Sequence, residues 1–161
     1  MTSAHVGQAK SSKNAMAKTL RETVGYVALE TSKLSQKILG VAFPISSLTI
    51  FAHSDEEYEL LVNQLNEIGE EYNYNNGPRV VLSNPIVVDD NIITHLRIRK
   101  PDTERPQVGC NDFDTDYKLF KSKYLDQHTE NLRLIIRPEY EMIEFHDPAF
   151  NVLAYVVSKQ L

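Results

Sequence analysis

A pattern that recurs after 59 residues restricts the fold of this 161-residue chain more than any other feature. Residues 55–61 and residues 114–120 both read Asp-x-acid-Tyr-x-Leu followed by a large apolar residue. The same offset relates two pairs of predicted strands: 48–53 with 107–112, and 94–98 with 153–157. A fixed offset that holds across three elements indicates a duplicated unit. The alternative is that capped amphipathic helices look alike without any duplication.

The repeat predicts an α+β fold in which the order strand, helix, three strands occurs twice. Two such units side by side form a curved antiparallel sheet, with helices on one face and a cup on the other. A cup of this kind is a natural pocket for a small molecule. The predicted parts are a disordered or non-native tail (1–13), an N-terminal helical arm (14–44) and a duplicated domain (45–161, with units 45–101 and 106–161).

Helix signals set the element boundaries. Apolar residues at three- and four-residue steps predict a helix over 14–39, capped by Gly40, and Thr31-Ser32 is a point where it would divide in two. Ser54 and Glu57 have the spacing of a capping box and predict a helix to about residue 72. Asp114 is the predicted N-cap of the last helix, which runs to about residue 127. The predicted strands are 45–54, 78–83, 85–89, 91–100, 107–113, 131–137, 140–146 and 151–158.

Composition excludes several classes of protein. The formal net charge of −5 argues against general nucleic-acid binding, which needs clustered Lys and Arg. Cys110 is the only cysteine, so no internal disulfide and no CxxC zinc site can form, and a lone thiol fits the reducing cytosol. No apolar run approaches the roughly 20 residues that cross a bilayer, and the N-terminus lacks the apolar core of a secretory signal. We therefore expect a cytoplasmic protein.

A cationic strand is the first candidate site. In the strand 93–99, alternation places Leu96 and Ile98 on one face and His95, Arg97 and Arg99 on the other. If the apolar face packs on the helices, the cationic face lines the cup. Guanidinium groups match the planar oxygens of carboxylate and phosphate, so this face predicts an anion site. The alternative is a solvated edge strand that its charges protect from aggregation.

Other polar groups extend this site or form a second one. Arg79 and Tyr140 are candidate ligand-binding residues of the same cup. Glu144 and His146 share one face of the strand 140–146 and form a candidate acid–base pair. The alternative for that pair is a surface ion pair beside a turn. Cys110 is better explained as a buried structural thiol than as a nucleophile, because no base is adjacent in sequence.

The closing residues resemble a known family. The stretch 142–155 reads Met-Ile-Glu-Phe-His-Asp-Pro-Ala-Phe-Asn-Val-Leu-Ala-Tyr. It is similar to the last strands of the vicinal oxygen chelate superfamily, where an aromatic residue and Asp-Pro-acid-Gly-Asn precede an apolar pair and Glu. The paired strand–helix–three-strand order is similar too, and the resemblance covers residues 45–158. The stretch 94–112 resembles the YecM-type branch of the superfamily.

Metal-using members of that superfamily take His and Glu ligands from the first and last strand of each unit. The resemblance places the final Glu on Ala154 and, by the 59-residue offset, its counterpart on His95. The opening strands offer no His at the remaining two positions. One ligand does not hold Zn²⁺, Fe²⁺ or Mn²⁺, so we predict no cofactor. If a divalent metal is bound, the ligands are expected to be His95, Glu144 and His146.

Three functional hypotheses follow. The first is a binding protein for a small anionic molecule, with the cationic strand as its wall. The second is a metal-dependent or metal-free enzyme of the lyase, isomerase or dioxygenase type that uses Glu144 and His146. The third is an interaction module, a homodimer included, in which the N-terminal helix presents Leu20, Val24 and Val27 to a partner.

Overall fold

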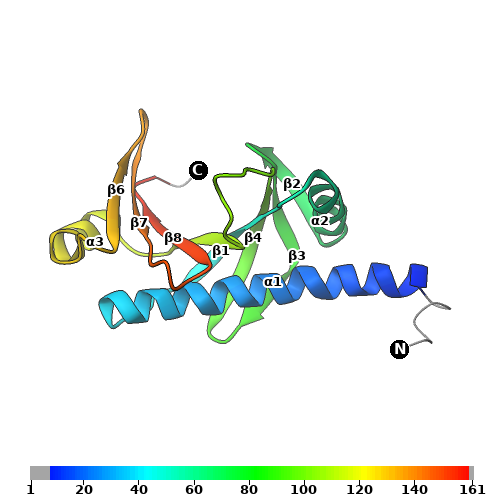
Figure 1. Cartoon of the computed structure of the whole chain (residues 1–161), viewed down its shortest axis with the longest axis horizontal. Helices are drawn as coiled ribbons and strands as arrows, with labels where there is room; N and C mark the ends of the chain where they lie inside the picture. Colours follow the sequence, from blue (N-terminus) through cyan, green and yellow to red (C-terminus); the bar gives the residue numbers. More distant parts are fainter. Residues whose placement is uncertain (1–7, 160–161) are drawn as a thin grey trace.

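The computed structural model describes the backbone of residues 8–159 and the side chains of residues 20–159. Within that range the chain forms an eight-stranded mixed sheet with helices packed on one face (Figure 1). The elements in chain order are α1 (Gln8–Leu39), β1 (Ile45–Phe51), α2 (Asp55–Ile68), β2 (Gly69–Tyr74), β3 (Pro78–Val88), β4 (Asn91–Arg99), β5 (Gly109–Phe113), α3 (Tyr117–Tyr124), a 3-10 turn (Leu125–Gln127), β6 (Leu132–Ile136), β7 (Glu141–Phe145) and β8 (Val152–Val157).

The strand order confirms the predicted fold of two strand–helix–three-strand units. The order is β2-β3-β4-β1-β5-β8-β7-β6, so the first strands of the two units meet at the centre as an antiparallel pair. The prediction of an antiparallel sheet is wrong for two pairs, because β1 pairs with β4 and β5 pairs with β8 in parallel. Three strands follow each helix, and the last of them runs in the same direction as the first strand of its unit.

Helix α1 is part of the core. It runs beneath the central strands, with α2 and α3 at opposite ends of the sheet (Figure 1). Leu20, Val24 and Val27 are buried against the sheet. The helix does not divide at Thr31, because the Thr31 hydroxyl donates to the Val27 carbonyl at 2.8 Å and leaves the helix intact. It begins at Gln8, inside the segment expected to be a tail; residues 1–7 of that segment lie outside the described range.

The capping prediction for α2 is confirmed. Ser54 accepts a hydrogen bond from the Glu57 amide at 3.1 Å, and the Glu57 carboxylate accepts from the His53 amide at 2.7 Å. Two amides at the helix start therefore have side-chain acceptors. The helix ends at Ile68 rather than near residue 72, and the residues that follow form edge strand β2.

Replacement of this cap tests the first unit. We expect Ser54→Ala to lower the free energy of unfolding by about 1 kcal/mol, because the Glu57 amide loses its acceptor. Urea denaturation measures the change. Ser122→Ala, at an exposed position within α3, is the matched control and should show no loss. Equal stability of the two variants would contradict the role given to Ser54.

The second helix begins later than predicted. Its N-cap is Asp116, which accepts from the Leu119 amide at 2.9 Å, and not Asp114. The two caps, Ser54 and Asp116, are further apart than the 59-residue offset. The unit order therefore repeats, while the offset inferred from the helix sequences does not align the two helices. The segments predicted as strands 78–83 and 85–89 also form one strand, β3, with an irregularity between Val81 and Ile86.

Candidate functional site

Strand β4 carries its cationic residues on the concave face. Leu96 and Ile98 belong to the core on the helix side, while Arg97 and Arg99 lie opposite Thr49 and Phe51 of β1 on the other face. Strand β4 lies between β3 and β1, so its charges do not protect a sheet edge. Ile93 departs from this alternation: it is two residues before His95, yet it is fully buried in the helix-side core.

A cavity of about 250 Å³ opens on this concave face. Five of the seven arginines in the sequence line it, although the chain is acidic overall: Arg79, Arg97, Arg99, Arg105 and Arg137. Its other lining residues are Thr49, Asn75, Asn76, Cys110, Asp112, Tyr140, Met142, Tyr155 and Val157. The gathering of five guanidiniums around one carboxylate makes this cavity strongly cationic.

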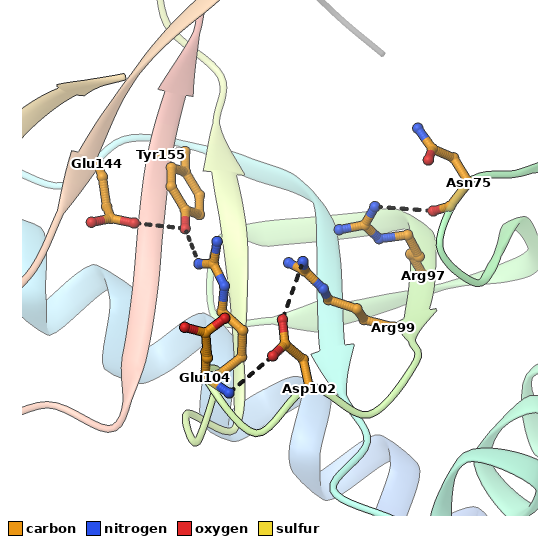
Figure 2. A network of polar contacts seen from close by, with 8 residues as sticks. Asn75, Arg97, Arg99, Asp102, Glu104, Glu144 and Tyr155 are labelled. Carbon is orange, nitrogen blue, oxygen red and sulfur yellow. Dashed lines mark hydrogen bonds and ion pairs between the residues drawn. The ribbon is translucent and has the colours of Figure 1, made fainter. Parts of the chain in front are cut away.

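Three of these arginines form a continuous cationic surface. Arg79 and Arg97 are direct cross-strand partners on β3 and β4, an arrangement that like charges disfavour. Among the described residues, no hydrogen-bond partner reaches the buried Nε atoms of Arg79, Arg97 and Arg99. Arg97 donates from Nη1 to the Asn75 carbonyl at 3.3 Å (Figure 2). Buried donors without acceptors are costly, so these three Nε groups are an unfavourable feature of the protein as it stands.

The pKa of Arg97 reflects its burial and the positive charges beside it. Burial lowers the pKa of Arg97, and the charges of Arg79 and Arg99 lower it further. Arg99 lies over the Phe51 ring, with its guanidinium carbon 5.6 Å from the ring centroid. Its counter-ion is distant, since Arg99 Nη2 and Asp102 Oδ2 are 3.9 Å apart. An anion in the cavity would relieve the repulsion among the three cations.

Arg105 reaches the cavity from the connection between the two units, which lies between the predicted strands 91–100 and 107–113 and was assigned no strand or helix. Its Nη1 donates to the Tyr155 hydroxyl at 3.3 Å, and that hydroxyl donates to Glu144 at 2.9 Å. Arg133 pairs with the other oxygen of Glu144. Figure 2 shows Tyr155 and Glu144 on one side of the cup and Arg97 and Arg99 on the other. Sequence reasoning missed Arg105 because nothing local indicates where a linker side chain points.

Two further groups line the floor of the cavity. Asp112 of β5 is partly buried, and burial raises its pKa to about 6 although Arg97 and Arg79 act in the opposite direction. Burial raises the pKa of the Cys110 thiol to about 12, with the Asp112 charge as the next cause. Cys110 is therefore a protonated thiol at neutral pH, which is a poor nucleophile.

His95 lies in a smaller recess beside the cavity. The recess measures about 40 Å³ and shares Arg79, Arg97 and Asp112 with the larger space. His95 Nδ1 is 2.7 Å from the Thr94 hydroxyl, and its ring meets Tyr72 edge to face at 5.6 Å between centroids. The structure thus brings together Arg79, Arg97, Arg99 and Tyr140 of the predicted anion site, with His95 adjacent.

Glu144 and His146 lie elsewhere, in a separate cavity of about 430 Å³. Glu144 is 3% exposed and bonds to Arg133 and Tyr155, and the backbone of His146 pairs with Asn131. These bonds make Glu144 part of a fixed polar chain rather than the partner of His146. The two sites meet at Arg105, which lines both cavities.

The alternative metal ligands are not assembled. His95 is on β4 and Glu144 on β7, with β1, β5 and β8 between them, which is roughly 19 Å at the usual strand spacing. Among residues whose side chains are described, no three His, Cys, Asp or Glu gather as a metal site. Ala154 belongs to the helix-side core, whereas His95 faces the cup. The 59-residue offset therefore equates positions on opposite faces of the sheet.

The surface of α1 gives little support to a free apolar stripe. Leu20, Val24 and Val27 are 1%, 0% and 0% exposed, and the exposed large apolar residues of the described helix are Tyr26 and Leu29.

In the described part of the chain, no helix combines the length and apolar character needed to span a membrane.

Comparison with known proteins supports the fold alone. No family model matches the chain, and no curated protein matches it. A solved structure described as "Structural Genomics, Protein EC4020" is similar, with a TM-score of 0.58 and 11% sequence identity over 84% of this chain and 86% of that one. At this identity the likeness shows a shared arrangement of helices and strands and no shared activity.

Proposed function

We propose that this protein binds a small anionic molecule in the concave cavity, with Arg79, Arg97 and Arg99 as its principal contacts. One observation carries the proposal: three clustered guanidiniums have buried Nε donors without acceptors among the described residues. Arg97 and Arg99 project from an interior strand. The backbone of Arg97 is paired with β1 and β3, and that of Arg99 is paired with β1. A carboxylate or phosphate oxygen would accept from these guanidinium groups and reduce the repulsion among them.

The resemblance to the vicinal oxygen chelate superfamily is part of this proposal. The unit order and the central antiparallel pair of first strands are consistent with it. The residues present do not fit the metal centre of that superfamily, because the described part of the chain gathers no three metal ligands. We therefore assign the cup to anion recognition. We place the protein in the cytosol on the basis of its single buried thiol.

Titration with sulfate tests the proposal, because sulfate remains a dianion at neutral and mildly alkaline pH. We expect saturable binding in isothermal titration calorimetry, and Arg97→Gln should weaken it at least tenfold through loss of a charge-assisted contact. Arg21→Gln, at an exposed position on α1, is the matched control and should leave affinity unchanged. Absence of saturable binding, or equal effects of the two variants, would refute the assignment.

A further inference from the structure

The arginines of the cavity fall into two groups on opposite sides. Arg79, Arg97 and Arg99 come from β3 and β4 of the first unit, and we call them the first wall. Arg105 from the β4–β5 connection and Arg137 from the β6–β7 turn form the second wall. Strands β1, β5 and β8 separate the strands that frame the two walls, and Figure 2 shows Arg97 and Arg99 facing Tyr155 across this space.

Both walls carry excess positive charge. Among the described residues, Asp112 is the only one whose carboxylate lines the cavity, and its charge acts on Arg97 of the first wall. Asp102 approaches Arg99 from outside the cavity at 3.9 Å. Glu144 has no direct hydrogen bond to Arg105: it accepts from the Tyr155 hydroxyl that Arg105 contacts, and its charge acts on Arg105 from there. An anion with a single head can contact one wall and leaves the charge of the other wall uncompensated.

The space between the walls is suited to a short linker. Cys110, Met142 and Val157 contribute apolar atoms to the lining, and the Tyr140 and Tyr155 rings flank them. At roughly 30 Å³ for each water-sized group, 250 Å³ accommodates about eight non-hydrogen atoms. That volume fits a compact molecule with one group at each end.

We infer that the ligand of this cavity carries two oxyanion groups, carboxylate or phosphate, one held by each wall and joined by a short apolar spacer. The inference rests on the proposed function and adds the second wall to it. Arg97 and its neighbours hold one head, and Arg137 with Arg105 holds the other. A molecule of this class neutralises both walls at once, which a single head of the same total charge does not.

Calorimetric titration of the full chain with charge-matched anions tests this inference. Sulfate has two charges on one head, whereas succinate and glutarate have one charge on each of two heads; acetate supplies a single carboxylate. Methylenediphosphonate forms a separate arm that tells phosphate heads from carboxylate heads. The variants are Arg97→Gln in the first wall, Arg137→Gln in the second, and Arg21→Gln as the control.

We expect succinate to bind at least tenfold more tightly than sulfate, its charge-matched single-headed counterpart, and more tightly than acetate. Methylenediphosphonate should likewise bind more tightly than inorganic phosphate. Arg137→Gln should weaken the two-headed anion at least fivefold more than it weakens sulfate, while Arg97→Gln should weaken both. Arg137 is exposed, so its replacement should leave the fold intact, which circular dichroism checks. If sulfate binding persists and needs Arg97 while two heads bring no gain, this inference fails and the proposed function stands. If sulfate does not bind either, both fail.

Discussion

The Gly77→Ala variant is expected to lose more than about 3 kcal/mol of folding free energy. Gly77 follows Asn76 in the turn between β2 and β3 and has φ of +119°, a conformation that L side chains rarely adopt. A Cβ at this position would come within 1.8 Å of the Ile98 carbonyl oxygen. Backbone strain and a clash with the backbone of β4 therefore add together, and neither can be relieved by rotating a side chain.

This turn also supports the candidate site. The Asn75 carbonyl accepts from Arg97, and the Asn76 carbonyl accepts from the Lys100 amide at 3.4 Å. Displacement of the turn should disturb the first wall as well as the fold. Urea denaturation measures the loss of stability, and sulfate titration of any folded fraction measures the effect on the site.

Gly25→Ala is the matched control for that prediction. Gly25 lies within α1, and a Cβ there would meet no atom within 4 Å. Alanine stabilises a helix interior by roughly 0.5–1 kcal/mol relative to glycine, so this variant should gain stability. A Gly77→Ala protein as stable as the wild type would show that the turn readily relaxes away from β4.

Local patterns predicted Arg97 and Arg99 of the first wall, because alternation along a strand is a local property. Arg97 and Arg99 follow buried Leu96 and Ile98 at every second position, and no knowledge of the rest of the fold is needed to place them on one face. The same reasoning missed Arg105, since a linker has no periodicity. Which face of the sheet a linker crosses depends on where the two units meet.

Strand β2 was missed for a different reason. Five of its six residues are exposed, so the strand has no apolar face, and Glu70-Glu71 continues the composition of the preceding helix. Gly69 was the one residue in the sequence that indicated the end of the helix. In the structure a Cβ at this position would come within 2.7 Å of the Val81 carbonyl oxygen, so the close approach of β3 requires glycine. Pairing with β3 holds this segment extended, and that long-range contact overrides local helix propensity.

The acid–base candidates show the limit of reasoning from one strand. Glu144 and His146 share a face of one strand by alternation, but a buried carboxylate bonds to whatever donors the fold brings to it. Those donors are Tyr155 on β8 and Arg133 on β6. No pattern within the strand identifies them, because each depends on the register between neighbouring strands.

The Asp112→Asn variant is expected to be more stable than the wild type at pH 8, by on the order of 2–3 kcal/mol. Burial raises the pKa of Asp112 to about 6 from an ordinary value of 3.8, against the opposing charges of Arg97 and Arg79 and with a small contribution from Asp114. The folded protein therefore holds this proton more tightly than the unfolded chain does. The stability contributed by the protonated group is complete below about pH 4 and is lost as the pH rises through about 6. Partial exposure of the side chain keeps the expected gain below the full conversion of the pKa difference.

Comparison of the two proteins across pH isolates this effect, because carboxylates such as Glu141 and Asp147, with lowered pKa values, act in both. The difference in unfolding free energy should be near zero at pH 4 and reach its plateau above pH 7. Asp114→Asn, at an exposed position two residues away, should stay within about 0.5 kcal/mol of the wild type throughout. Sulfate affinity at pH 8 should rise about tenfold in Asp112→Asn, since the variant removes a negative charge from the lining of the cavity. A variant less stable than the wild type at pH 8 would mean that ion pairs with Arg97 and Arg79 outweigh burial, and the first wall would then have less charge to offer a ligand.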